Sequence, residues 1–386
     1  MLEPGIENKV NLLVNWLITV FFFIGISLPG MRLLCTAPAK EISEAENRQL
    51  MPLPAWHWDK LSIEAYPSAY ERYFNDHFGC RDRLIRWHHY LKAIIFHVSP
   101  VEKVLIGREG WLYFTEHDMV KDFLGQVPYN EQELLGIKDN LQARQEILAR
   151  LGMKYLLVIA PDKHSIYPEY LPDYLLQQRG ETRLDQLVSY LRRTSTVNLL
   201  DLRGVLLEEK FRLGNESLLY LIKDTHWNQR GAFVAYRAIM AAIRSWSPET
   251  VGLTDSDLVM ETKLSTRGDL ANMLDLNELL PEQAPYLRVK VARSQRDDTH
   301  GQFFGSFASR YKESYRVPFM TKGGNSPLRV VVFRDSFFTD IAPFFSESFE
   351  HVTYIYEAYN EQIMVQLLGQ RLKPDLVVEE IIERYL

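Results

Sequence analysis

Cysteine is nearly absent from this sequence, since Cys35 and Cys80 are the only two among 386 residues. Two cysteines exclude a disulfide framework and a cysteine-based zinc site, and they leave open a single Cys35–Cys80 bridge. An excess of basic charge is also missing, because the formal net charge is −6. A phosphate backbone requires a basic face on its partner, so we expect no nucleic-acid partner.

Motifs for phosphate and metal binding are missing as well. Gly107–Gly110 is too short for a phosphate loop and lacks the following Lys-Ser/Thr, so Val101–Phe114 is predicted to be two short strands around a turn. His88, His89 and His97 lie on a predicted helix without a His-Glu-x-x-His pattern, and adjacent helical histidines point in different directions. We therefore expect no metal site and no cofactor.

Only one apolar run is long enough to cross a membrane. The uncharged stretch Val10–Met31 has 22 residues between Lys9 and Arg32, and a helix needs about 20 to span a bilayer. Ala37–Ala39 resembles a signal-peptidase site, but it lies far from the apolar core and has proline in the middle. We expect residues 1–36 to be an uncleaved membrane anchor, with a cleaved signal peptide as the alternative.

The rest of the chain divides into a polar segment and a segment in which strands and helices alternate. Residues 37–100 are predicted to be a linker followed by two helices, Glu64–Asn75 and Arg81–His97. From residue 101 onward, wholly apolar strands alternate with helices, which is typical of a parallel sheet covered on both faces. The expected strands are Lys154–Ala160, Val197–Leu200, Arg329–Phe333, His351–Ile355 and Asp375–Ile382. Residues 247–326 break this pattern and are predicted to be a loop- and β-rich insertion.

Asp224 and His226 lie in a loop just before a predicted helix, Gln229–Ile243, which Asn228 is expected to cap. A carboxylate two positions before a histidine can bind the ring Nδ1–H, fix the tautomer and stabilise the imidazolium. By itself this pattern also fits a structural loop histidine, so a catalytic interpretation needs a nucleophile elsewhere.

Ser336 is the candidate nucleophile, because it follows the strand Arg329–Phe333 and precedes helix-like sequence. Open α/β sheets place ligands at the carboxyl ends of their strands, and a helix N-terminus there stabilises a developing oxyanion. A serine hydroxyl needs a base to take its proton, and His226 is the best candidate. The alternative is that Asp335 or Ser336 only caps the helix.

These motifs resemble a known family. Arg334–Phe337 resembles the Gly-Asp-Ser block of SGNH hydrolases, with arginine in place of glycine, and Asp224–Asn228 resembles their Asp/His block with the spacing Asp-x-His. The order of the blocks is reversed, which a circular permutation explains. Pro374–Ile382 and Lys154–Pro161 resemble the strands before and after the SGNH Gly-x-Asn-Asp block, which has no clear match here.

Permuted SGNH domains with Asp-x-His-Trp resemble the AlgJ/AlgX family of polysaccharide O-acetyltransferases, and the resemblance covers roughly residues 53–386. It implies an α/β, SGNH-like fold and transfer of an acetyl group through a Ser336 ester to hydroxyls of an alginate-like exopolysaccharide. His226 would be the base and Asp224 would orient it. A carbohydrate acetylesterase with the same triad and a non-catalytic scaffold of a polysaccharide secretion complex are the alternatives.

The resemblance also implies partners and a location. A membrane-bound O-acyltransferase would supply the acetyl group, other acetylation and secretion proteins would assemble with the chain, and an inner-membrane anchor would hold the catalytic domain in the periplasm. The residue that donates a second hydrogen bond to the oxyanion is left open. Candidates for oxyanion or substrate contacts are Arg334, Trp227, Lys163, Tyr167 and Arg384. The aromatic members could stack on sugar rings or pack in the core, and Gly268–Asn272 could line a cleft or form a short capped helix.

Overall fold

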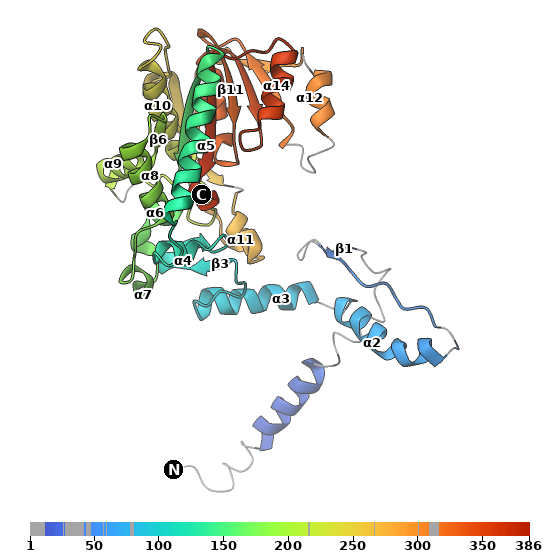
Figure 1. The fold of residues 1–386 in the computed structure, drawn as a ribbon. Helices are drawn as coiled ribbons and strands as arrows, with labels where there is room; N and C mark the ends of the chain where they lie inside the picture. The colour runs from blue at the N-terminus through green and yellow to red at the C-terminus, as the bar shows by residue number, and fades with distance from the viewer. Residues whose placement is uncertain are drawn as a thin grey trace. The chain divides into compact units, whose positions relative to one another are not determined.

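The computed structural model describes residues 12–25, 27, 42–43, 48–56, 58, 60–77, 81–214, 217–265, 267–299, 301–308 and 316–386. The chain divides into two compact units, Met1–Pro100 and Val101–Leu386, which are drawn in Figure 1. Cys35 and Cys80 lie outside the described residues, as does part of the apolar run expected to be a membrane anchor.

The described part of the first unit is mainly helical. Residues 12–25 and 27 are helical with exposed side chains. The helices α2 (Lys60–His77) and α3 (Arg81–Tyr90) confirm the two predicted after the linker, and a π-helical turn (Leu91–Ile95) follows α3. Within the residues described, we find no helix with both the length and the apolar character to cross a bilayer.

A seven-stranded mixed sheet forms the centre of the second unit, in the order β6-β5-β13-β11-β12-β10-β9. Its strands are β5 (Lys154–Ala160), β6 (Leu199–Asp201), β9 (Gln295–Asp297), β10 (Phe319–Lys322), β11 (Ser326–Phe333), β12 (Phe349–Ile355) and β13 (Leu376–Ile382). The run from β6 to β12 is parallel and confirms the five predicted strands. The permuted order requires β13 to lie beside β5, and the two strands pair along seven residues of each.

The expectation of a wholly parallel sheet is wrong at one edge. β10 pairs antiparallel with β12, and β9 pairs antiparallel with β10. Both strands come from residues 247–326, so this region is not simply an insertion beside the sheet. They cover backbone groups of β12 that would otherwise form an open edge. The same region also contributes a separate hairpin, β7 (Leu258–Ser265) with β8 (Glu282–Val289).

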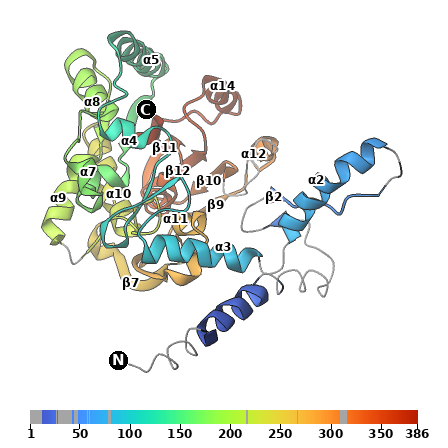
Figure 2. The same ribbon diagram turned by 90° about the horizontal axis from the view of Figure 1, so that it is seen from below.

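Two layers of helices cover the sheet because successive residues of a strand face opposite sides. The even-numbered residues of β5 pack with α10 (Gln229–Arg244), and the odd-numbered ones pack with residues of α5 (Glu131–Arg150), α8 (Arg183–Thr194) and α14 (Glu361–Gly369). Figure 2 shows α5, α8 and α14 on one side of the sheet and α10 on the other. Burial on both faces explains why β5 is apolar from Tyr155 to Ala160.

The parallel strands bring their carboxyl ends to one edge. Asp162 follows β5, Glu383 follows β13, and Asp335 and Ser336 follow β11. The predicted hairpin is confirmed as β3 (Val104–Ile106) and β4 (Leu112–Phe114), and Leu112 N donates to Ile222 O in the loop before α10. The turn with Ser336 and the loop with Asp224 and His226 therefore lie near the edge where open α/β sheets bind their ligands.

Candidate active site

The loop Leu221–His226 is closed at its base by backbone hydrogen bonds. Leu221 N donates to His226 O at 3.1 Å, and Asn228 N donates to Leu219 O at 2.9 Å. The Asn228 side chain accepts from the backbone N–H groups of Arg230 and Gly231, which confirms the predicted cap of α10. The cap fixes where the helix begins and so fixes the direction in which the loop leaves it.

The structure brings together the three residues expected to act in catalysis. His226 Nε2 lies 2.8 Å from Ser336 Oγ, and His226 Nδ1 lies 2.6 Å from Asp224 Oδ1. With a proton on Nδ1, the ring donates to Asp224 and its Nε2 accepts from the serine hydroxyl. These contacts join segments 110 residues apart in sequence and form the chain of hydrogen bonds that a serine nucleophile requires.

Burial and hydrogen bonding together set the charges of this group. Burial alone would raise the pKa of the Asp224 carboxyl, but bonds from the His226 ring, from the His226 backbone N–H and from the Asp269 backbone N–H hold that pKa well below its usual range. Burial alone would lower the pKa of His226, but the Asp224 carboxylate outweighs it and Asp269 adds to the effect, so the pKa is raised. Asp224 is therefore the anion that stabilises an imidazolium.

Ser336 lies in a tight turn rather than at the start of a long helix. A 3-10 turn (Phe337–Thr339) and a short helix, α13 (Ala342–Ser346), follow it. The expected stabilisation by the N-terminus of a regular helix is therefore wrong in this form, because the macrodipole needs aligned helical turns. Instead, Asp335 Oδ1 accepts the Phe337 N–H at 2.8 Å and holds the turn.

Asp335 also ties the nucleophile turn to β13. Its Oδ2 accepts the Ile382 N–H at 2.8 Å, and its own N–H donates to Glu380 Oε2 at 3.0 Å. Burial, together with the neighbouring Asp335 charge, raises the pKa of Glu380 well above its ordinary value. Sequence reasoning missed this pair, because a glutamate inside an apolar strand shows no partner until the neighbouring strand is known.

Lys163 is buried, with 3% of its surface exposed, and so it is not placed to contact a substrate. Its ammonium donates to the carbonyl oxygens of Leu221, Ile222 and Asp224 at 2.9, 2.9 and 2.7 Å. Burial lowers its pKa to about 7. Lys163 therefore supports the loop that carries Asp224 and His226.

The aromatic candidates pack in the core, which is one of the two roles left open by the sequence. Trp227 is fully buried and its Nε1 donates to Phe337 O at 3.0 Å, joining the histidine loop to the nucleophile turn. Tyr167 is buried, and its hydroxyl accepts the Leu219 N–H at 2.9 Å. In this conformation neither ring is available to stack on a sugar.

Arg334 and Arg384 make structural contacts beside the triad. Arg334 Nη1 donates to Asp335 O and to Thr339 Oγ1, both at 3.0 Å, so it braces the nucleophile turn. Arg384 pairs with Asp162 and lies 5.6 Å from the centre of the Phe337 ring.

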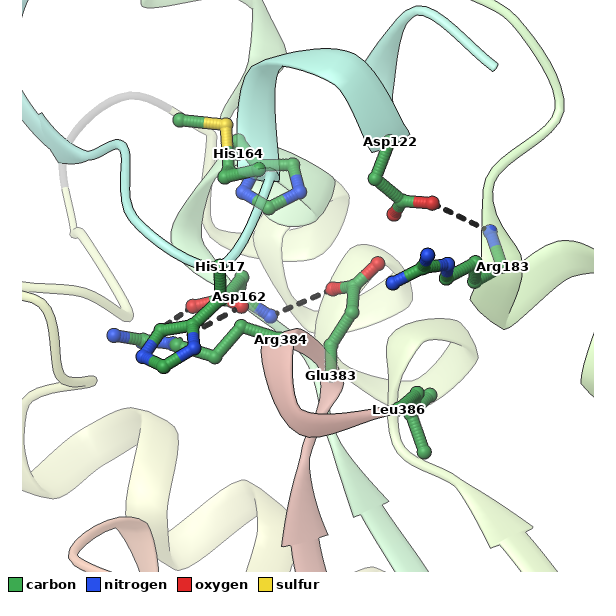
Figure 3. A pocket seen from close by; sticks show the side chains of 9 residues that line it. His117, Asp122, Asp162, His164, Arg183, Glu383, Arg384 and Leu386 are labelled. Atoms are coloured by element: carbon green, nitrogen blue, oxygen red, sulfur yellow. Dashed lines mark hydrogen bonds and ion pairs between the residues drawn. The ribbon is translucent and has the colours of Figure 1, made fainter. Parts of the chain in front are cut away.

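Arg384 lines a small pocket at the carboxyl ends of β5 and β13, together with Asp162, His164 and Glu383. Figure 3 shows Arg384 paired with Asp162 and the Glu383 side chain next to them. Glu383 accepts from Asp162 N at 2.7 Å and from Ser165 Oγ at 2.8 Å. Burial, together with the Asp162 charge, raises the pKa of Glu383 to about 8.

Asp224, His226 and Asp269 offer three donor atoms within 4.8 Å of one another. Two of these atoms, His226 Nδ1 and an Asp224 oxygen, already bind each other. We interpret the cluster as proton-transfer machinery and assign no metal to it. Asp269 and Glu282 both contact the loop; Asp269 lies in the segment Gly268–Asn272 noted from the sequence, without a role of its own, and Glu282 was not singled out. Gly268–Asn272 includes the start of a short helix, α11 (Asp269–Met273).

Comparison with known proteins assigns the chain to a family. The family described as "SGNH hydrolase-like domain, acetyltransferase AlgX" matches residues 104–309, which is more than half of the chain. The chain belongs to this family. The match includes Asp224, His226 and Asp269, and it ends before Ser336.

Curated relatives named "Probable alginate O-acetylase AlgJ" are similar over part of the chain. Those of Pseudomonas aeruginosa and Azotobacter vinelandii are 25% and 29% identical over 185 and 189 residues, which is 47% of this chain and 44% of each relative. The match therefore spans less than half the length of these relatives. The solved O-acetyltransferase domain of Pseudomonas putida AlgJ is 20% identical, with 73% of this chain and 91% of that chain covered and a TM-score of 0.45.

Proposed function

We propose that this protein is an O-acetyltransferase that carries an acetyl group as a Ser336 ester and delivers it to a hydroxyl of an alginate-like exopolysaccharide. Membership of the acetyltransferase family and the name of the relatives support this reaction class. The observation that carries it is the hydrogen-bonded chain from Ser336 Oγ through His226 to Asp224, with distances of 2.8 and 2.6 Å.

In the first half-reaction, Ser336 Oγ attacks the carbonyl carbon of an acetyl ester while His226 Nε2 takes the hydroxyl proton. The tetrahedral oxyanion then collapses, the donor's C–O bond breaks, and the leaving oxygen takes the proton from Nε2. Asp224 stabilises the imidazolium between these two events. We assign the Ser336 backbone N–H as one donor to the oxyanion.

The second half-reaction runs the same chemistry on a sugar. A sugar hydroxyl gives its proton to His226 Nε2 and attacks the acetyl-serine. Collapse then breaks the bond to Oγ, which recovers the proton from the imidazolium. Since 21% of the His226 side-chain surface is exposed, the ring can meet an acceptor from solvent.

The setting of this reaction follows from the same family assignment. We infer a periplasmic catalytic domain held at the inner membrane. A membrane-bound O-acyltransferase would supply the acetyl group, and other acetylation and secretion proteins would work beside it. Holding the chain at the membrane would raise its local concentration at the donor.

The proposal is tested by incubating the purified protein with an acetyl ester, with and without an alginate oligosaccharide. We expect acetylated oligosaccharide from the wild type, and a trapped acetyl group on Ser336 by mass spectrometry. Ser336→Ala should abolish both. Release of acetate without acetylated sugar would instead identify an esterase. Unchanged turnover in Ser336→Ala would show that Ser336 is not the nucleophile, and a wild type without any turnover would leave only the scaffold role.

A further inference from the structure

The loop that carries Asp224 and His226 has no regular secondary structure, so its buried backbone groups need partners from elsewhere. Lys163 supplies donors to three of its carbonyl oxygens. Acceptors for three of its N–H groups come from residues 247–326. Glu282 of β8 accepts from Ile222 N at 2.7 Å and Lys223 N at 3.2 Å, and Asp269 of α11 accepts from Thr225 N at 2.7 Å.

Asp269 makes the most extensive of these contacts. Its Oδ2 accepts from Thr225 Oγ1 at 2.5 Å, and its Oδ1 accepts from Leu270 N as well as from Thr225 N. Its own backbone N–H donates to Asp224 Oδ2 at 3.0 Å. Asp224 and Asp269 therefore hold each other's segments in place, since a backbone group of Asp269 binds the carboxylate of Asp224 and the carboxylate of Asp269 binds the residue after Asp224.

Asp269 also reaches the imidazole. Its Oδ2 lies 3.7 Å from His226 Nδ1, and the Thr225 hydroxyl that it binds lies 3.1 Å from the same nitrogen. Because Thr225 donates its proton to Asp269, a lone pair of its oxygen faces the Nδ1–H. The ring N–H is thus shared between the Asp224 carboxylate and a hydroxyl oriented by Asp269.

We propose that Asp269 is a positioning residue of the transfer reaction, which sets the orientation and basicity of His226 through Thr225 and through its own negative charge. This inference rests on the proposed function and deepens it. Burial and the neighbouring Asp224 charge raise the pKa of the Asp269 carboxyl, while the His226 ring and the hydrogen bonds from Thr225 favour its ionised form. The region expected to lie beside the sheet as an insertion therefore completes the arrangement of the triad.

The charges that face His226 allow the effect to be assigned. Asp224 lies on the same loop, Asp269 on α11 and Arg384 on the C-terminal turn. The first two raise the pKa of the ring and Arg384 lowers it. Removing the Asp269 charge should therefore lower the pKa of His226, while Asp224 and Arg384 stay in place.

Glu282 provides a matched control. It accepts two backbone N–H groups of the same loop, whereas Asp269 accepts one, and its partners Ile222 and Lys223 precede Asp224. Glu282→Gln removes a carboxyl acceptor from the loop and leaves the groups beside the His226 ring unchanged. A role limited to holding the loop would make Asp269→Asn and Glu282→Gln behave alike.

The test compares Asp269→Asn, Glu282→Gln and the wild type in the full chain, using hydrolysis of an acetyl ester from about pH 5 to about pH 9. Asp269→Asn should lower kcat by about tenfold, equal to ~1.4 kcal/mol, with KM nearly unchanged. It should also move the acidic limb of the profile to lower pH. Glu282→Gln should lower the rate without moving that limb.

A direct titration separates this inference from the proposed function. NMR of labelled histidine in the Ser336→Ala background reports the His226 pKa without turnover, so it is informative even if the wild type transfers no acetyl group. A lower His226 pKa in Asp269→Asn alone supports the inference. An unchanged pKa in folded Asp269→Asn, or an equal shift in Glu282→Gln, overturns it.

Discussion

Lys163 Nζ lies 2.7 Å from the carbonyl oxygen of Asp224, and it also binds the carbonyl oxygens of Leu221 and Ile222. Charge-assisted hydrogen bonds in a buried site are worth about 1.5–3 kcal/mol each. Lys163→Met keeps the apolar stem and removes the ammonium. We expect kcat/KM for an acetyl ester to fall by at least about tenfold, measured on protein whose circular dichroism shows it to be folded.

The same variant should change how stability depends on pH. Burial lowers the pKa of Lys163 from 10.5 to about 7, so between these values the unfolded chain binds the proton and the folded chain does not. This group therefore makes stability rise with pH across that window, by up to ~1.4 kcal/mol per pH unit. Urea titrations should show that Lys163→Met lacks this rise, and an unaltered slope would contradict the assignment.

The variant Asp224→Asn should show whether the Asp224 carboxylate orients the His226 ring or only contacts it. An asparagine can still accept from one donor, but its amide group cannot accept both the His226 ring N–H and the Asp269 N–H, which now bind different oxygens. We expect kcat to fall by about 10³–10⁴-fold, as for the orienting carboxylate of a serine triad. The fall is measured in the acetyl ester assay, with an intact thermal transition as control. A loss of less than about tenfold would place Asp224 outside the triad.

Gly231 allows α10 to approach the strand-like segment before the histidine loop. A Cβ there would lie 2.3 Å from Leu219 O and 2.9 Å from Trp227 Cβ. Leu219 O accepts the bond that closes the loop, so Gly231→Ala should destabilise the fold by about 1–3 kcal/mol and lower activity. Gly136→Ala, inside α5 with nothing within 4 Å, should instead stabilise by up to about 1 kcal/mol. Equal melting temperatures for both variants would contradict this packing argument.

The parts of the fold that depend on local sequence were predictable. β5 was predicted with its observed bounds because it is apolar on both faces, and α10 was predicted with its Asn228 cap because capping is a contact between near neighbours. The short helix at Gly268–Asn272 was one of two alternatives that its sequence allowed. The Ser336–His226 contact joins residues 110 positions apart, and it was predicted from the places of both residues in loops of one α/β sheet before the family resemblance supported it.

The supports of the site were not predictable from single motifs. Lys163, Asp269 and Glu282 come from three separate segments. Lys163 was singled out for a contact with the oxyanion or substrate, and the two carboxyl groups resemble ordinary surface charges until the loop at Asp224 is folded against them. The antiparallel pairing of β10 with β12 was missed for the same reason. Nothing in residues 319–322 indicates which edge of the sheet they join, since that choice depends on the three-dimensional order of the strands.

The pocket in Figure 3 predicts a second pH effect, of opposite sign to that of Lys163. Burial and the Asp162 charge raise the pKa of Glu383 from 4.5 to about 8, so between these values the folded chain holds a proton that the unfolded chain has lost. Stability from this group is therefore present below about pH 4.5 and decreases as pH rises towards 8.

Glu383→Gln tests this effect, because the amide resembles the protonated carboxyl group and does not ionise. The free energy of unfolding, measured by urea denaturation at several pH values, should favour the variant increasingly as pH rises from about 5 to about 8. The acceptor for Asp162 N is retained by the amide oxygen, so the turn after β5 should stay in place. A difference between variant and wild type that stays constant across this range would show that Glu383 is ionised in the folded protein.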